Sequence, residues 1–186
     1  MHNVKTVFLK ELSSFFYSPM AYIFLVVFAL VNGYFFTNTF FLYDQSDMRA
    51  LFNITPLIFL FFIPAISMSL IARERNLGTM EIISTLPLKN HEFVLGKYLA
   101  AWAFTGIALM LTFPVWITVN YLGDPDNGVV IAAYIGSFLM AGAYLAIGAC
   151  ISALTKNQVI AFVVAVVVCF LFTITGLPMV TNLFSS

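Results

Sequence analysis

Five long apolar runs dominate this sequence, and none of them contains a charged residue. They cover residues 21–43, 54–72, 98–122, 129–154 and 159–177. About 20 apolar residues in a helix cross the roughly 30 Å hydrocarbon core of a bilayer, so each run is about long enough to span it. The whole chain is 62% hydrophobic and 9% charged, which is unlike a soluble domain. We therefore expect an all-α integral membrane protein with five transmembrane helices.

The segment before the first run has the pattern of an amphipathic helix. Its apolar stripe recurs at helical spacing and consists of Val4, Phe8, Leu12 and Phe15. The charged residues Lys5, Lys10 and Glu11 fall largely off this stripe. Pro19 then permits a turn into the first run. Residues 1–18 are therefore predicted to form a helix at the membrane interface, and the alternative is that they simply extend the first span.

A polar interval at residues 72–97 separates the second and third runs and holds seven of the sixteen charged residues. Gly78 breaks a helix, Thr79 can cap a new one, and Pro87 ends it. The helix so delimited places one of two apolar sets on a single side: Met80, Ile83 and Leu86, or Ile82 and Leu86. Glu81 falls in the first turn, where the helix dipole favours a carboxylate. The pattern predicts a short helix suited to docking, followed by a longer helix that Asn90 caps.

The basic residues are divided unequally between the two sides of the predicted bundle. One side carries Lys5, Lys10, Arg73, Arg75, Lys89, Lys97 and Lys156, whereas the other carries Arg49. Cytoplasmic loops of membrane proteins are enriched in lysine and arginine, so the first side is expected to be cytosolic. This orientation places the N-terminus and the polar interval in the cytosol. The outer side then receives Asp44, Asp47, Asp124 and Asp126.

The sequence lacks the motifs of several functional classes. A phosphate-binding loop requires G-x-x-x-x-G-K-[ST], but around Gly96 and Lys97 the first glycine position holds His91 and the last position holds Tyr98. His91 and Glu92 are too few to hold a metal ion. We therefore expect no nucleotide hydrolysis and no cofactor or metal on this chain. The absence of charge inside the spans also argues against a proton relay or ion-coupled carrier.

A spaced set of residues in the polar interval resembles the loop signature of ABC-2 type transporter permeases. The set consists of Glu74-Arg75, Gly78-Thr79, Glu81, Pro87, Glu92 and Gly96-Lys97. Within that family the chain most resembles the gliding-motility-associated permease and the permease of copper-processing ABC systems. The resemblance covers nearly the whole chain.

The resemblance implies a permease subunit of an ATP-driven transporter, which exports a substrate while a separate ATPase binds ATP and magnesium. Residues 72–97 would be the cytosolic coupling loop and residues 1–18 the elbow helix. The residues implied to contact the ATPase are Gly78, Thr79, Met80, Glu81, Ile82, Ile83, Leu86 and Pro87. Family members carry a sixth span, so residues 178–186 are expected to be the outer segment of a truncated chain.

The resemblance also implies an assembly of two ATPases with two permease chains, identical or related, in a bacterial inner membrane. No nucleic-acid partner is expected. Arg73, Glu74 and Arg75 lie where the second run meets the cytosol, and they either relay motion through ion pairs or only set orientation. Two other functions stay open, namely a membrane scaffold that docks a partner without transport, and a channel or carrier. Copurification with an ATPase would separate the first function from these two.

Overall fold

The computed structural model describes residues 2–43, 49–84, 89–123 and 125–176, and these ranges contain helices and no strand. The helices are α1 (His2–Tyr17), α2 (Pro19–Tyr43), α3 (Arg49–Ser67), α4 (Ala72–Asn76), α5 (Thr79–Ser84), α6 (Asn90–Met110), α7 (Phe113–Leu122), α8 (Asn127–Leu154) and α9 (Gln158–Thr175). A bilayer leaves a spanning segment no partner for its backbone except itself, which is why the apolar runs form helices. The all-α architecture is confirmed.

The five predicted spans are confirmed as well. Five helical stretches are long and apolar enough to cross a membrane: Ala21–Asn38, Phe52–Asn76, Asn90–Tyr121, Asn127–Leu154 and Gln158–Thr175. The third stretch consists of α6 and α7, which meet at Leu111 and Thr112. Pro114 lies in the first turn of α7, where a missing N–H is tolerated, so the third span restarts there. Pro64, by contrast, lies inside α3.

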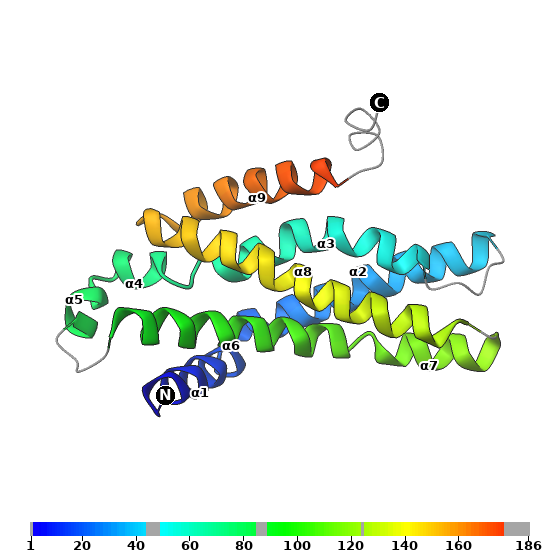
Figure 1. The fold of residues 1–186 in the computed structure, drawn as a ribbon, viewed down its shortest axis with the longest axis horizontal. Coiled ribbons are helices and arrows are strands. Elements are labelled where there is room, and N and C mark those ends of the chain that lie inside the picture. The colour runs from blue at the N-terminus through cyan, green and yellow to red at the C-terminus, as the bar shows by residue number, and fades with distance from the viewer. Residues whose placement is uncertain (1, 44–48, 85–88, 124, 177–186) are drawn as a thin grey trace.

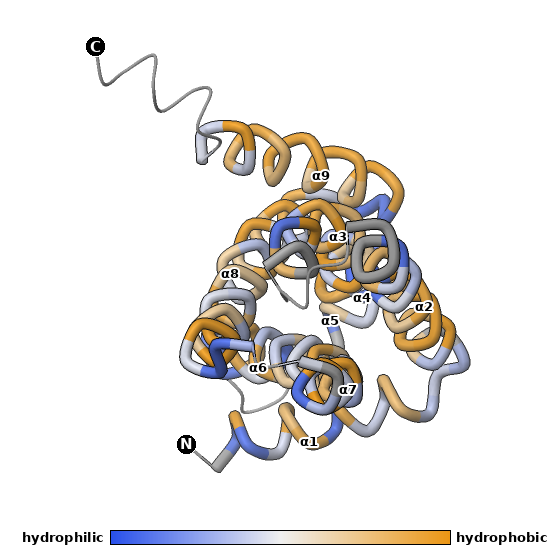
Figure 2. Tube along the Cα trace, turned by 90° about the vertical axis from the view of Figure 1, so that its right-hand side faces the viewer, coloured by the Kyte–Doolittle hydropathy of each residue, from blue (hydrophilic) through white to orange (hydrophobic). Residues whose placement is uncertain are grey.

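The spans form an elongated bundle whose two ends differ (Figure 1). The short helices α4 and α5 lie at one end, together with the start of α6 and the turn between α8 and α9. Helix α7 and the start of α3 lie at the other end. Seen along the bundle in Figure 2, α6 and α7 are nearly end-on, whereas α1 runs across them. The seven basic residues predicted to share one side therefore lie on elements near the end that carries α4 and α5.

The core of the bundle is built from large side chains of α2, α3, α6 and α8. Phe28, Phe59 and Phe104 are almost completely buried, and so are Ile63 and Leu145. The rings of Phe28 and Phe59 stack at 6.0 Å between centroids, which joins α2 to α3. Helix α9 is peripheral, and most of its outward residues are apolar and exposed, as expected for a surface in contact with lipid.

Helix α1 is separate from the first span, because the chain turns at Ser18 and α2 begins at Pro19. It packs on α6, where Val7 lies against Gly96 so closely that a Cβ on Gly96 would be 2.7 Å from the Cβ of Val7. The predicted stripe needs a correction in one respect. Glu11 was placed off the packed face, but it is half-buried and faces α6 through an ion pair with Lys97.

Candidate functional site

The predicted coupling segment consists of two short helices joined by a tight bend. Helix α4 ends at Asn76, and α5 begins at Thr79. Gly78 between them has a φ of +71°, a conformation that residues with a Cβ rarely adopt. Gly78 therefore breaks the helix as predicted. Thr79 does not cap α5 from outside; it is the first residue of that helix, and its hydroxyl donates to the carboxylate and the backbone carbonyl of Glu74.

The structure places the other residues of the predicted coupling set as follows. Met80 is half-buried and packs against the chain's own core, whereas Glu81 is exposed. Ile82 and Ile83 belong to α5. Leu86 and Pro87 lie outside the described residues, and Asn90 is the first residue of α6 while its cap position is Lys89. An apolar residue that the sequence pattern did not single out, Leu77, is 66% exposed in the bend.

A cluster of charged side chains ties this segment to two other helices. Lys97 of α6 is only 4% exposed. Its Nζ forms ion pairs with Glu11 of α1 and, at 3.2 Å, with Glu74 of α4. The centroid of the Phe93 ring lies 5.2 Å from the same Nζ. Because a buried cation needs paired charges and hydrogen bonds to offset its desolvation, this ion-paired cluster fixes α1, α4 and α6 relative to one another.

The predicted polar relay is therefore only partly assembled. Glu74 belongs to the ion-paired cluster, but Arg73 and Arg75 are exposed and do not join it. The sequence pattern missed Lys97 and Glu11 as its members. One signal was present, because Lys97 lies among apolar residues at the start of the third run, where an unpaired charge would be costly.

A cavity of about 540 Å³ lies beside the ion-paired cluster, between α1, α3 and α4. Glu11, Glu74 and Lys97 form part of its wall, and two further cations, Lys10 and Arg73, also line it. Leu77 contributes from the bend. The cavity thus brings the bend, the N-terminal helix and the end of the second span to one place.

The connection between α3 and α4 is held by α8. Ile71 precedes α4 and offers no side-chain cap. The Ser152 hydroxyl of α8 instead accepts from the N–H groups of Ile71 and Ala72, at 3.1 and 3.0 Å, and donates to the carbonyl of Met68 at 3.1 Å. Since Ser152 is fully buried, no water replaces these bonds, and the start of α4 follows the position of α8.

Among the residues that the structure describes, no three His, Cys, Asp or Glu side chains gather where they would hold a metal ion. The arrangement instead suits mechanical work. A short helix is joined by a glycine bend to the helix stub α4. That stub is bonded to α6 through Glu74 and to α8 through its buried N-terminus, and Lys97 of α6 is in turn paired with Glu11 of α1. A force applied to the short helix would therefore reach α1, α6 and α8.

A model of a known protein family matches most of the chain. The model of the family described as ABC-2 family transporter protein matches residues 37–186, which include the last four spans and only the end of the first. No curated protein and no solved structure matches. The matched region contains α4, α5 and Lys97, the parts that the geometry links mechanically. The chain belongs to the ABC-2 family of transporter membrane proteins.

Proposed function

We propose that this chain is a permease subunit that a separate ATPase drives through α5. The observation that carries the proposal is the ion-paired cluster, because it connects the segment next to α5 with both the N-terminal helix and the third span. Membership of the ABC-2 family gives the general role of an ABC transporter permease. The contact with the ATPase and the route of force are the parts proposed here.

The proposed sequence of events starts when two ATPases bind ATP and magnesium and close on each other. Their closure moves α5, and the bond between Thr79 and Glu74 carries the movement into α4. From Glu74 it passes to Lys97 of α6, and from the start of α4 it passes to Ser152 of α8. Two permease chains facing each other would open an export pathway between them. Arg73 and Arg75 would contribute at the membrane surface.

Further parts of the proposal rest on the resemblance and on charge. Residues 1–18 act as the elbow helix, and residues 72–97 form the coupling loop. The chain is placed in a bacterial inner membrane with its N-terminus in the cytosol, and ATP and magnesium stay on the ATPase. The subfamily proposed is that of gliding-motility-associated or copper-processing permeases.

The docking role of α5 is tested by Ile82→Asp and Ile83→Asp. Burying an isoleucine is worth about 1.5 to 3 kcal/mol, so one charged replacement in an ATPase groove should weaken docking roughly ten-fold or more. Each variant should reach normal membrane levels yet copurify with less ATPase and lose transport-dependent growth or motility. Leu77→Asp should act in the same direction, because Leu77 is exposed in the bend beside α5.

Met80→Asp serves as the contrasting variant within the same helix. Met80 packs against the chain's own core, so its replacement should lower the amount of folded protein instead of leaving levels normal. Normal levels with wild-type ATPase binding and wild-type transport in Ile82→Asp, Ile83→Asp and Leu77→Asp would remove the docking role of this segment. A stable complex with a cytosolic protein other than an ATPase would favour the scaffold function.

The proposed orientation predicts which end of the bundle reacts with an impermeant thiol reagent. Tyr121 ends the third span and is 93% exposed, whereas Lys156 lies in the turn between α8 and α9 at the opposite end. After Cys150, which is exposed, has been replaced by serine, Tyr121→Cys should react in intact cells. Lys156→Cys should react only after permeabilisation. The reverse pattern would contradict both the orientation and the cytosolic position of α5.

A further inference from the structure

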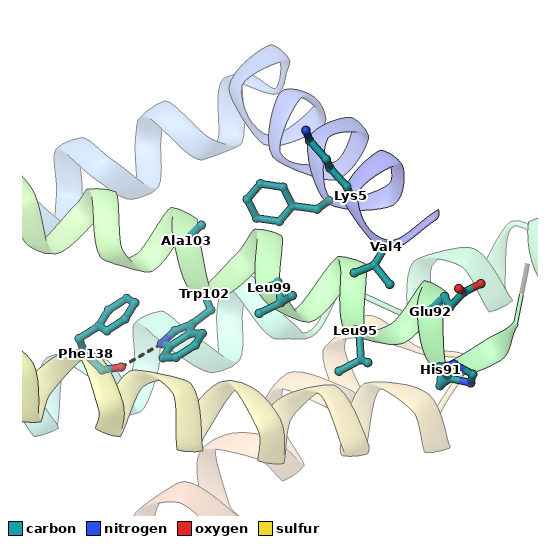
Figure 3. Close-up of a pocket in the computed structure, with 10 residues that line it drawn as sticks. Val4, Lys5, His91, Glu92, Leu95, Leu99, Trp102, Ala103 and Phe138 are labelled. Carbon is teal, nitrogen blue, oxygen red and sulfur yellow. Dashed lines mark hydrogen bonds between the residues drawn. The ribbon is translucent and has the colours of Figure 1, made fainter. Parts of the chain in front are cut away.

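The first part of the third span, α6, is fixed to α8. The indole ring of Trp102 stacks on Phe138 of α8 at 4.6 Å between centroids, and its Nε1 donates to the Phe138 carbonyl at 3.0 Å (Figure 3). One turn earlier, the Tyr98 hydroxyl donates to the Gly142 carbonyl at 3.0 Å. The buried side chains of α6 belong to the main core as far as Leu109. Helix α6 is therefore held in place up to its last turn.

The third span is interrupted between α6 and α7 (Figure 1). The N–H of Thr112 donates to the Leu109 carbonyl at 3.0 Å, a bond over three residues instead of the four of an α-helix. Pro114 has no N–H and cannot donate to the Met110 carbonyl, which would be its partner in a continuous helix. No side chain caps the start of α7. Because the regular backbone bonds are lost here, Leu111 and Thr112 form the place where the span bends most easily.

Helix α7 packs on a small core of its own. Of residues 113–121, Val119 alone is buried. It forms a cluster with Val130 of α8, and the aromatic rings packed against the two valines are those of Phe36, Phe52, Trp116 and Tyr134. This cluster has no residue in common with the main core that α6 enters. Lipid chains are as apolar as these side chains, so little hydrophobic driving force keeps α7 against the bundle.

Side chains of α8 make hydrogen bonds that hold α7 and the break. The Thr112 hydroxyl donates its proton to the Leu109 carbonyl at 2.7 Å, so the Tyr134 hydroxyl is the donor in its 2.8 Å bond to Thr112 Oγ1. Thr112 is buried, so no water competes for this bond. Further along α7, Trp116 Nε1 donates to Asn127 Oδ1 at 2.9 Å. The first bond fixes the break, and the second fixes the helix beyond it.

We propose that α7 is a hinged gate at the end of the bundle opposite α4 and α5, with its hinge at Leu111 and Thr112. In the closed position, which the structure shows, Tyr134 bonds the hinge and its ring stacks on Phe113 at 5.2 Å between centroids. In the open position the bonds to Tyr134 and Asn127 are broken, and α7 tilts away from α8 while α6 stays in place. Residues 123–126 connect α7 to α8 and reach about 13 Å when extended, which leaves slack for the tilt.

Opening would part α7 from the rings that α2 and α3 contribute to its small core. In the assembly of two permease chains, this would widen the end of the pathway from which an exported substrate leaves. That role in release rests on the proposed function, whereas the movement of α7 itself does not.

Distances between spin labels test the movement in the purified chain in lipid nanodiscs, after exposed Cys150 has been replaced by serine. Cysteines for labelling replace Tyr121, near the end of α7, and Leu57 of α3, both of which are exposed. Double electron–electron resonance should give a main distance and a minor, longer one. Tyr134→Phe keeps the ring but loses the hydroxyl, and it should raise the minor fraction about three-fold, the factor that corresponds to about 0.6 kcal/mol for a hydrogen bond between membrane helices. Trp116→Phe should change the fraction in the same direction.

The same two substitutions in α6 are the matched controls. Tyr98→Phe and Trp102→Phe also remove a hydroxyl and an indole bond to α8, but on the fixed side of the hinge. Both should therefore give the distances of the wild type. Unchanged distances in Tyr134→Phe and Trp116→Phe would overturn the gate. Equal changes in all four variants would overturn it as well, because α7 would then move no more readily than α6.

Pro114→Ala tests the role of the hinge in transport. Alanine supplies the backbone donor that the break lacks, so the two labels should show a narrower range of distances. The transporter that carries this variant should copurify with its ATPase like the wild type but transport more slowly. Wild-type transport despite narrowed distances would overturn the role of α7 in release, and it would leave the docking of α5 unaffected.

Discussion

Replacing Lys97 with methionine is expected to destabilise the protein by about 3 to 5 kcal/mol, the range found when one partner of a buried ion pair is removed. Methionine keeps the length and apolar character of the lysine stem, so little packing against Phe93 is lost. What is lost is the cation between Glu11 and Glu74, whose side chains are only 18% and 23% exposed. Thermal unfolding in detergent, followed by size-exclusion chromatography, measures the loss.

Two further variants test whether the stability loss in Lys97→Met comes from the missing charge or from another cause. Lys89→Met removes an exposed lysine one residue before α6 and should leave stability within about 0.5 kcal/mol of the wild type. The triple variant Lys97→Met, Glu11→Gln, Glu74→Gln should recover much of the loss, since replacing a whole buried ion cluster by neutral groups costs far less than breaking it. A Lys97→Met protein as stable as Lys89→Met would show that the cluster does not hold these helices together.

The Lys97→Met variant also tests coupling between the ATPase and transport. Glu74 would still hold Thr79, but its link to α6 would be gone. If force travels through Lys97, ATP hydrolysis by the assembled transporter should continue while transport falls, in the fraction of Lys97→Met molecules that remain folded. If transport falls only in proportion to the folded fraction, the route through α6 is not used.

The spans were predictable because their signal is local. Each apolar run is about as long as a bilayer demands, and the composition excludes a soluble domain, so the ends of α2, α8 and α9 fall within a few residues of expectation. The glycine bend was predictable for the same reason, since Gly78 suits a positive φ. The starts of helices were less predictable. Thr79 and Asn90 were expected to be N-caps, but they are the first residues of α5 and α6, a shift of one position.

The ion-paired cluster was not predictable, because its members are distant in sequence. Glu11 and Lys97 are separated by 86 residues, and one sequence contains no record of which distant residues meet. Placing the third span from residue 98 onward also left Lys97 outside it, whereas α6 begins at Asn90 and buries Lys97 two turns in. The hydrogen bonds of Ser152 were not predictable for the same reason, because Ile71 and Ala72 precede it by 81 and 80 residues.

Gly148→Ala is the second change for which we expect a large effect. A Cβ at this position of α8 would lie 2.6 Å from the Cβ of Ser67 and closer still to its hydroxyl. Ser67 is fully buried and its hydroxyl donates to the Pro64 carbonyl at 3.1 Å, so it has little room to withdraw. Helices α3 and α8 must then separate, and overpacking of this kind costs about 1 to 3 kcal/mol.

The separation should have a second consequence one turn further along α8. Ser152 would be drawn away from the N–H groups of Ile71 and Ala72, which are buried and have no water to replace it. Leaving a buried donor unsatisfied costs about 1 to 3 kcal/mol more. We therefore expect Gly148→Ala to reduce the yield of folded protein severely, and the remaining molecules to transmit less movement from α4 to α8.

Gly136→Ala is the matched control, because it makes the same change on α8 at a position where a Cβ meets nothing within 4 Å. Alanine is the better helix former, so this variant should be as stable as the wild type or slightly more stable. The double variant Gly148→Ala, Ser67→Gly removes the atoms that clash and should recover part of the loss, which a double-mutant cycle quantifies. If Gly148→Ala unfolds at the same temperature as Gly136→Ala, the close crossing of α3 and α8 does not determine stability, and Ser152 does not depend on it.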